Sequence, residues 1–204
     1  MKDGLEAQEK ISLLIPCYNE QEALPLFYRE AAAVLGQMTY DYEMIFINDG
    51  SKDQTLAVIK ELAEQDRRVR YLSFSRNFGK EAAMYAGFCH AQGNYTAVMD
   101  ADLQDPPSLL PQMMEILQSG EYDSVAARRV SRAGEPLVRS WFARRFYKLV
   151  NRISDADIVD GARDFRLMKK KMADAVVSMG EYNRFSKGIF GWIGFRTYWL
   201  PFEN

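Results

Sequence analysis

The segment of this sequence with the most specific chemistry is a short acidic stretch near its middle. Asp100 and Asp102 are separated by one residue, and Gln104 follows at the same spacing. Alternate side chains of an extended segment point to the same side, so we expect the two carboxylates and the amide to face one way. Carboxylate and amide oxygens without a neighbouring histidine or cysteine suit a hard cation, Mg²⁺ or Mn²⁺. A diphosphate is the natural ligand for the coordination positions that such a cation keeps open.

An aspartate pair after a strand also has a plain structural explanation. Acidic residues at such a position often only cap the next helix. The segment from Asp49 to Asp53 is equally ambiguous, because Asp-Gly-Ser-Lys-Asp is also a good turn followed by a helix cap. Each of these two motifs, taken alone, leaves both interpretations open.

The elements that position these residues follow from the hydrophobic pattern. Short apolar runs alternate with longer segments in which apolar residues recur every three or four positions, as in strands joined by crossover helices. The sequence therefore predicts an α/β fold with a Rossmann-like, mostly parallel sheet flanked by helices. The expected strands are Ile11–Ile15, Tyr42–Asn48, Val69–Phe74, Tyr95–Asp100, Ser124–Arg128 and Phe165–Lys169.

Helices are expected between these strands. Asn19 is placed to cap the first of them, with Glu22 three residues later in the spacing of a capping box. The other expected helices contain Leu56, Ile59 and Leu62, begin near Lys80, and follow Pro106 and Pro107.

Length and composition limit the classes of protein. With 204 residues, of which 48% are hydrophobic, the chain is expected to form a single compact domain. A net charge of -2 gives no excess of basic residues, so nucleic acid is not an expected partner. The two cysteines and one histidine argue against a disulfide framework or a zinc site. No apolar run approaches the roughly 18 residues of a transmembrane helix, so we expect no membrane-spanning segment in this chain.

Polar loops follow each of the first four expected strands. In open α/β sheets, ligands bind in the crevice beyond the carboxyl ends of the strands, so one crevice can hold all four loops. A tyrosine, several acidic residues and the aspartate pair could then contact the base, ribose and diphosphate of one nucleotide. The loops are Pro16–Glu20, Asn48–Asp53, Ser75–Lys80 and Asp100–Asp105.

In this order the loops resemble those of the inverting glycosyltransferases of family 2, and within that family the polyprenyl-phosphate glycosyltransferases. The resemblance extends over about residues 11–196 and implies the GT-A fold. It also implies a donor half at about 11–128 and an acceptor half at about 129–204. The motifs that carry it are IPCYNE (15–20), NDGSKDQT (48–55), SRNFGKEAAMYAG (75–87), MDADLQDPP (99–107) and RDFRLMKKK (163–171).

The resemblance assigns roles to residues of the donor site. It implies that Asp102 and Gln104 hold Mg²⁺ or Mn²⁺, with Asp100 on the ribose or diphosphate side. Lys80 falls near the nucleotide, and its alternative is an ordinary solvated lysine. The remaining residues expected to bind a UDP-glucose-like donor are Pro16, Tyr18, Asn19, Glu20 and Asp49.

The resemblance also places catalytic residues in the RDFRL motif. Asp164 stands where the family often has a base or an acceptor-positioning carboxylate, and Arg166 lies beside it in the sequence. A phosphate acceptor is already largely anionic at neutral pH, so Asp164 could be orienting rather than essential as a base. A salt bridge from Asp164 to Arg163 or Arg166 is the structural alternative.

Basic residues of the second half are candidates for contact with an acceptor and a membrane. Arg128, Arg184 and Lys187 could grip an acceptor phosphate. The segment 128–152 combines basic residues with apolar residues at helical spacing, which indicates an amphipathic helix on anionic lipid. A helix packed on the sheet is the alternative. Polyprenyl-phosphate relatives commonly continue into transmembrane helices, a region that we expect this chain to lack.

The first hypothesis for function is a hexosyltransferase that moves glucose from a UDP-sugar to polyprenyl phosphate. It would lie peripherally on the inner, cytoplasmic face of the membrane, either alone or as a homo-oligomer. A second hypothesis keeps the donor and uses a saccharide hydroxyl as acceptor. A third is a non-catalytic nucleotide-binding remnant. A nucleotidyltransferase is disfavoured because no glycine-rich phosphate loop with a lysine lies near the amino terminus.

Overall fold

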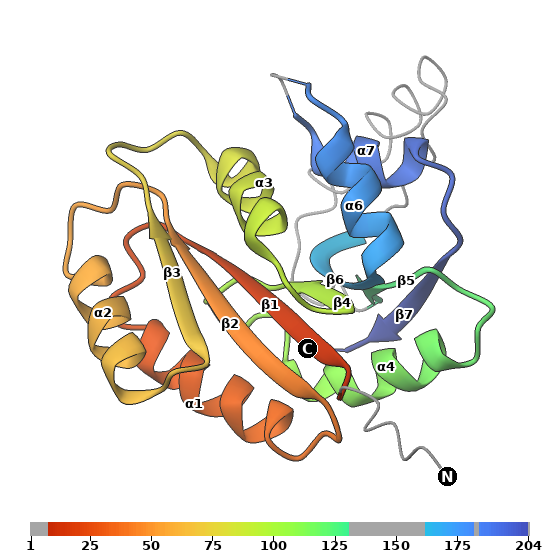
Figure 1. Ribbon diagram of the computed structural model, residues 1–204, viewed down its shortest axis with the longest axis horizontal. Helices are drawn as coiled ribbons and strands as arrows, with labels where there is room; N and C mark the ends of the chain where they lie inside the picture. Colours follow the sequence, from red (N-terminus) through yellow and green to blue (C-terminus); the bar gives the residue numbers. More distant parts are fainter. Residues whose placement is uncertain (1–7, 131–161, 182–183, 204) are drawn as a thin grey trace, which may run out of the picture.

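The computed structural model describes residues 8–130, 162–181 and 184–203. These residues form a seven-stranded sheet in the order β3-β2-β1-β4-β6-β5-β7. Five strands are those expected in the first half of the chain, and two come from the second half (Figure 1). Their bounds are β1 Lys10–Cys17, β2 Asp41–Asn48, β3 Val69–Ser73, β4 Tyr95–Val98, β5 Ser124–Arg129, β6 Ala162–Lys169 and β7 Thr197–Phe202.

The sheet is mostly parallel, as expected. β1 pairs in parallel with β2 and β4, β2 with β3, and β5 with β7. β6 is antiparallel to both of its neighbours, β4 and β5. Its first residues therefore lie at the edge of the sheet where β1, β2 and β4 end.

Helices cover both faces of the sheet (Figure 1). The core clusters show which helices share a face: α1, α2 and α4 pack on one side, and α3, α6 and α7 on the other. The helices are α1 Leu24–Leu35, α2 Thr55–Gln65, α3 Lys80–His90, α4 Leu110–Gln118, α6 Lys170–Ser178 and α7 Ser186–Trp192, with a short 3₁₀ turn, η1, at Pro107–Leu109. None of these described helices combines the length and the apolar character that crossing a bilayer requires.

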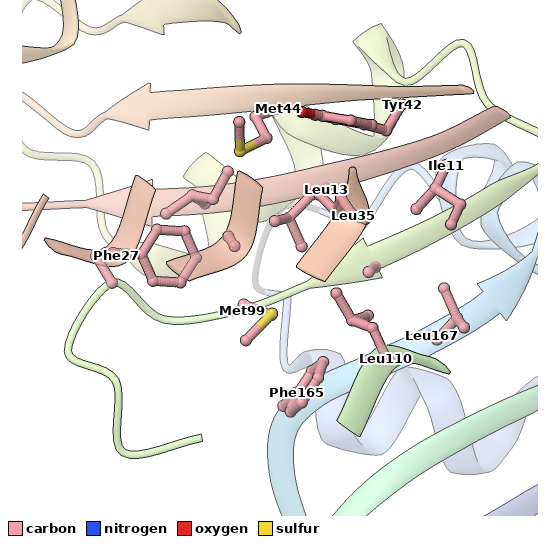
Figure 2. Packing of buried hydrophobic residues seen from close by; sticks show 14 of the residues in the cluster. Ile11, Leu13, Phe27, Leu35, Tyr42, Met44, Met99, Leu110, Phe165 and Leu167 are labelled. Atoms are coloured by element: carbon pink, nitrogen blue, oxygen red, sulfur yellow. The ribbon is translucent and has the colours of Figure 1, made fainter. Parts of the chain in front are cut away.

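Alternation along the strands divides the buried side chains between the two faces. On β1, Leu13 packs with α1 and α4, whereas its neighbour Leu14 packs with α3. Figure 2 shows the first of these clusters, with Phe27 of α1 and Phe165 of β6 among the residues around Leu13. Burying a large apolar side chain contributes roughly 1.5–3 kcal/mol, so the two clusters hold the strand ends in a fixed arrangement.

The expected first helix begins later than predicted. Asn19 does not cap it: Asn19 lies in the left-handed region with φ of 56°, and α1 starts at Leu24 without a side-chain cap. Pro25 stands in the first turn, where a residue without an N–H group is well accommodated, and this favours the later start. The amide oxygen of Asn19 instead accepts a hydrogen bond from the backbone N–H of Lys52, at 2.9 Å.

The second half holds elements that the hydrophobic pattern does not predict. The strand expected at Phe165–Lys169 is present as part of β6, but the sequence predicts no bounds for α6, α7 or β7. α7 has only seven residues, too few for a clear helical pattern, and Pro201 within β7 argues against a strand. The amphipathic helix expected within 128–152 lies almost wholly outside the described residues.

Candidate functional site

A cavity of about 330 Å³ opens at the carboxyl ends of β1, β2 and β4. This is the place where an open α/β sheet is expected to bind its ligand, and the volume suits a small molecule. All four polar loops contribute to its wall. The lining residues are Pro16, Cys17, Tyr18, Glu20, Asp49, Asn77, Gly79, Lys80, Asp100, Ala101 and Asp102.

Asp49 fixes the loop that leads into α3. It is 3% exposed, and its two carboxylate oxygens accept hydrogen bonds from the backbone N–H groups of Phe78 and Gly79, at 2.7 and 2.9 Å. The next residue, Gly50, has φ of +64°, and a Cβ there would lie 2.2 Å from the backbone carbon of Arg76. The loops after β2 and β3 therefore touch through their backbones, which places the start of α3 at the cavity.

The loop Pro16–Glu20 carries four of the predicted donor residues, of which three reach the cavity. Pro16, Tyr18 and Glu20 line it, whereas Asn19 is not among the lining residues and is tied to the loop after β2. Burial raises the pKa of Glu20, and the carboxylates of Asp102 and Asp100 raise it further. Negative charges are thus crowded around one side of the cavity.

The acidic loop is not extended, so the expected common orientation of its three side chains is wrong. β4 ends at Val98, and Leu103 adopts a left-handed backbone conformation with φ of 57°. Asp100 and Asp102 both line the cavity, but Gln104 does not. The Gln104 side-chain oxygen accepts a hydrogen bond from Arg163 at 3.1 Å, because the turn at Leu103 rotates the following residues away.

Arg163 also anchors the residue after Gln104. Its Nε lies 2.8 Å from Oδ1 of Asp105, a carboxylate that is only 1% exposed. Burial raises the pKa of Asp105, while the hydrogen bond and the charge of Arg163 oppose that shift. The first residues of β6 and the acidic loop are therefore joined by an ion pair whose carboxylate is buried and whose guanidinium group is partly exposed.

Lys80 joins the two halves of the site. Its ammonium group lies 2.6 Å from Oδ1 of Asp100 and 2.6 Å from Oδ2 of Asp164. Burial disfavours the charged form of Lys80, but the two carboxylates outweigh this effect and raise its pKa. The alternative of an ordinary solvated lysine therefore does not describe this residue.

Asp164 pairs with lysines rather than with the arginines of its own motif. Besides Lys80, the ammonium group of Lys187 lies 3.6 Å from its Oδ1. Burial acts to raise the pKa of Asp164, and the two lysines reverse this and hold it below its usual value. The alternative of a salt bridge to Arg163 or Arg166 is wrong, since Arg163 pairs with Asp105 and Arg166 lies deeper.

Arg166 is buried between the sheet and α7. It is 4% exposed, and its Nη1 donates to the hydroxyl oxygens of Ser124 and Thr197 at 3.0 and 3.2 Å. The guanidinium group also lies over the rings of Phe190 and Trp199. Burial lowers the pKa of Arg166 to about 10, with the charge of Asp164 opposing the shift. These contacts of Arg166 tie β5, β6 and β7 together beneath the site.

The three residues expected to bind an acceptor phosphate lie in different places. Lys187 reaches the site through Asp164. The guanidinium group of Arg184 donates to the carbonyl oxygens of Met179 and Val176, at the end of α6, and lies over the ring of Tyr85. Arg128 is exposed on β5 and is not among the residues that line the cavity.

The Glycosyl transferase family 2 model matches residues 12–177, which include all four polar loops and the RDFRL motif. The chain belongs to glycosyl transferase family 2. Two curated relatives show how far the similarity reaches. The "Putative glycosyltransferase CsbB" of Bacillus subtilis is 47% identical over 204 residues, which are 100% of this chain and 60% of that protein. The "Prophage bactoprenol glucosyl transferase homolog" of Escherichia coli is 44% identical over 92% of this chain and 61% of that protein. The chain thus spans about three fifths of the length of these relatives.

Solved structures share the fold of this family 2 chain. The mannosyltransferase PcManGT from Pyrobaculum calidifontis, in complex with GDP-Man and Mn²⁺, matches with a TM-score of 0.62 at 18% identity, covering 96% of this chain and 56% of that one. Glucosyl-3-phosphoglycerate synthase from Mycobacterium tuberculosis, in complex with Mn²⁺ and UDP-Glc, matches with a TM-score of 0.61 at 15% identity, covering 96% and 70%. The GT-A fold expected from the sequence is confirmed.

The donor set of this family 2 chain fits a hard divalent cation. Among residues 8–130, 162–181 and 184–203, no three His, Cys, Asp or Glu side chains converge as a ready metal site. The carboxylates of Glu20, Asp100 and Asp102 nevertheless line one cavity, where burial raises the pKa of Glu20 and the repulsion of the other two carboxylates raises it further. A cation would relieve that repulsion, and phosphate oxygens and water would complete its coordination.

Four residues line the cavity without having been singled out beforehand. All of them lie in the polar loops that the sequence identifies, so their position in those loops is the feature that could have predicted them. Cys17 is 2% exposed and donates its S–H to the carbonyl of Ile15, so it forms the floor rather than a reactive group. The others are Asn77, Gly79 and Ala101.

Proposed function

We propose that this chain is an inverting hexosyltransferase that moves glucose from UDP-glucose to a polyprenyl phosphate, with Mg²⁺ or Mn²⁺. The observation that carries the proposal is the single cavity that combines the side chains of Glu20, Asp100, Asp102 and Lys80. Three carboxylates beside one lysine suit a diphosphate bound together with a divalent cation, because the cation offsets part of the negative charge of both. Relatives of this chain that are named bactoprenol glucosyl transferase support the sugar and the acceptor.

Each group of the donor has a partner in this arrangement. Tyr18 is 41% exposed at the cavity and offers a ring for stacking on the base. Asp102 would hold the cation, which would neutralise charge on the leaving diphosphate, whereas Gln104, bonded to Arg163 outside the cavity, would not contact it. Lys80, at the first residue of α3, would add a second positive charge on the side of the cavity that faces Asp164.

The acceptor would approach from the side of β6 and α7. Lys187 lies on α7 and contacts Asp164, so one lysine stands on each side of that carboxylate. A phosphate monoester is largely ionised at neutral pH, so it needs cations nearby more than it needs a base. The phosphate oxygen would displace the diphosphate from the anomeric carbon in one step, which inverts the configuration.

We infer that the chain lies on the cytoplasmic face of a membrane, and exposed aromatic residues near Lys187 support contact with a membrane surface. Trp192, at the end of α7, is 62% exposed, and Phe185, just before α7, is 47% exposed. Aromatic rings beside basic side chains are typical of surfaces that lie at a membrane interface. We place the lipid chain of the acceptor along this side of the molecule.

Transfer of label tests the proposal. The 204-residue chain is incubated with UDP-[¹⁴C]glucose, Mn²⁺ and undecaprenyl phosphate in detergent, and radioactivity is measured in the organic extract. We expect lipid-linked label that disappears with EDTA and with Asp102→Asn. Label that enters a water-soluble oligosaccharide instead would replace the acceptor in this proposal. Binding of UDP without any transfer or donor hydrolysis would contradict an enzymatic role.

A further inference from the structure

Asp164 has both of its carboxylate oxygens directed at lysine side chains. Oδ2 accepts a hydrogen bond from Lys80 at 2.6 Å, and Oδ1 lies 3.6 Å from the ammonium group of Lys187. The side chain is 24% exposed. A general base needs an oxygen that can approach the proton it removes, whereas these oxygens already stabilise two cations.

Asp164 is not among the residues that line the cavity, but Lys80 and Asp100 are. The Lys80 ammonium group bridges the two aspartates, with Asp100 at 2.6 Å on the cavity side. The path of contacts from Asp164 to the cavity therefore runs through Lys80. A substitution at Asp164 would therefore affect a bound donor chiefly by changing the position of the Lys80 ammonium group and the net charge around it.

The helix that carries Lys80 also determines where Lys187 lies. Glu81, the next residue of α3, accepts hydrogen bonds from the backbone N–H and the hydroxyl of Ser186, the first residue of α7. Lys187 follows Ser186 directly. Adjacent residues at the start of α3 thus fix both lysines around Asp164, one facing the cavity and one on α7.

We propose that Asp164 is a positioning residue, which holds the ammonium groups of Lys80 and Lys187 on either side of itself and takes no proton from the acceptor. The inference rests on the proposed function for the acceptor, because a phosphate that arrives already ionised requires no base. In this arrangement Lys80 interacts with the donor and Lys187 with the acceptor. A saccharide hydroxyl, which must lose a proton, would not suit this arrangement.

A double-mutant cycle on UDP binding tests the inference without any acceptor. Calorimetry with UDP and MnCl₂ is carried out on the wild-type chain, Asp164→Asn, Lys80→Met and the double variant. In Asp164→Asn, Lys80 keeps one carboxylate partner instead of two, so the net charge beside the cavity rises and UDP should bind about fivefold tighter. In the Lys80→Met background the same substitution should change the affinity by less than about twofold.

Two results would overturn the inference. If Asp164→Asn leaves UDP affinity unchanged while abolishing transfer, Asp164 acts on the acceptor directly, as a base does. If it changes the affinity by the same factor with and without Lys80, the effect does not pass through that lysine. Should Asp164→Asn fail to fold, Asp164→Glu replaces it with a different expectation. The charge is kept but the longer side chain displaces the Lys80 ammonium group, so UDP affinity should change with Lys80 present and by less than about twofold in the Lys80→Met background.

Lys187→Gln is the matched variant for the acceptor side. UDP affinity should stay within about twofold of the wild type, because Lys187 does not line the cavity, whereas the KM for polyprenyl phosphate should rise about tenfold. A shift in UDP affinity instead would contradict the assignment of the two lysines. If no transfer to polyprenyl phosphate occurs at all but the UDP cycle shows coupling, the proposed acceptor is wrong and the positioning role of Asp164 stands.

Discussion

Substitution of Gly50 by alanine tests whether the donor loops are held together through their backbones. Gly50 has φ of +64°, and an added Cβ would lie 2.2 Å from the backbone carbon of Arg76 and 2.6 Å from the backbone nitrogen of Asn77. No side-chain rotation relieves such a contact. The loop after β3 must therefore move, together with the hydrogen bonds that Asp49 accepts from Phe78 and Gly79.

The expected loss of stability has two parts. A non-glycine residue in the left-handed region costs about 1–2 kcal/mol. Loss of one of the two hydrogen bonds to the Asp49 carboxylate adds roughly 1.5–3 kcal/mol. The sum is about 2.5–5 kcal/mol, a large part of the stability of a typical domain. Because Asn77, Gly79 and Lys80 line the cavity, affinity for UDP should also fall by about tenfold or more.

Gly120→Ala is the matched control. Gly120 has φ of +83°, but a Cβ there would meet nothing within 4 Å, and the residue is not part of the cavity wall. This variant should lose only the conformational part, about 1–2 kcal/mol, and bind UDP as the wild type does. Urea unfolding and calorimetry with UDP and MnCl₂ measure both quantities. If Gly50→Ala is no less stable than Gly120→Ala, the close approach of the two loops is not as described.

Three further predictions concern a buried carboxylate, the cation and the membrane. Glu43→Gln should lower the free energy of unfolding at pH 7 by about 2–3 kcal/mol, because Glu43 is 3% exposed and is bonded to Ser12 and Arg70. Burial raises the pKa of Glu43, but those hydrogen bonds outweigh it and hold the pKa below the usual value, so the carboxylate stabilises the fold above that range. The difference between Glu43→Gln and the wild type in urea unfolding should therefore shrink as the pH falls through the folded-state pKa, and an unchanged difference would contradict this reasoning. Asp102→Asn should remove the Mn²⁺-dependent part of UDP binding in calorimetry while leaving the melting temperature within about 2 °C, since the side chain lies in an exposed turn. Trp192→Ala should reduce co-sedimentation with phosphatidylglycerol vesicles by about tenfold without changing stability. Equal sedimentation of the variant and the wild type would show that α7 does not contact the membrane.

Most of the fold could be predicted because the pattern of apolar residues that defines each strand and helix lies within a short stretch of the sequence. The alternation that sends Leu13 and Leu14 to opposite faces of the sheet is visible in the apolar run of β1. The sites of the four loops follow from the same pattern, and they bring Tyr18, Glu20 and Asp102 to one cavity as expected. The prediction that Gln104 faces the same way as Asp100 and Asp102 failed, because the left-handed conformation of Leu103 turns Gln104 away from the cavity.

The charge pairs of the site could not be predicted, because they join residues far apart in the chain. Lys80 and Asp164 are 84 positions apart. Their contact depends on β6 pairing with β4, which no local pattern indicates. The pairing of Arg163 with Asp105 depends on the same strand. Arg163 and Arg166 are the basic residues nearest to Asp164 in the sequence, and for that reason they were the expected partners. In the structure its partners are lysines from α3 and α7.

The reversed direction of β6 has a consequence for redesign of this chain. Since β6 enters the sheet at the edge where β1, β2 and β4 end, Arg163 and Asp164 at its start lie beside Asp105 and Lys80. Its register is held at the far end, where Lys169 pairs with Tyr95 and Met168 with Thr96. Substitutions at Arg163 and Asp164 would therefore change the charges at that edge, while the parallel strands and their polar loops keep their places. The charged contacts at this edge can thus be redesigned separately from the parallel part of the sheet.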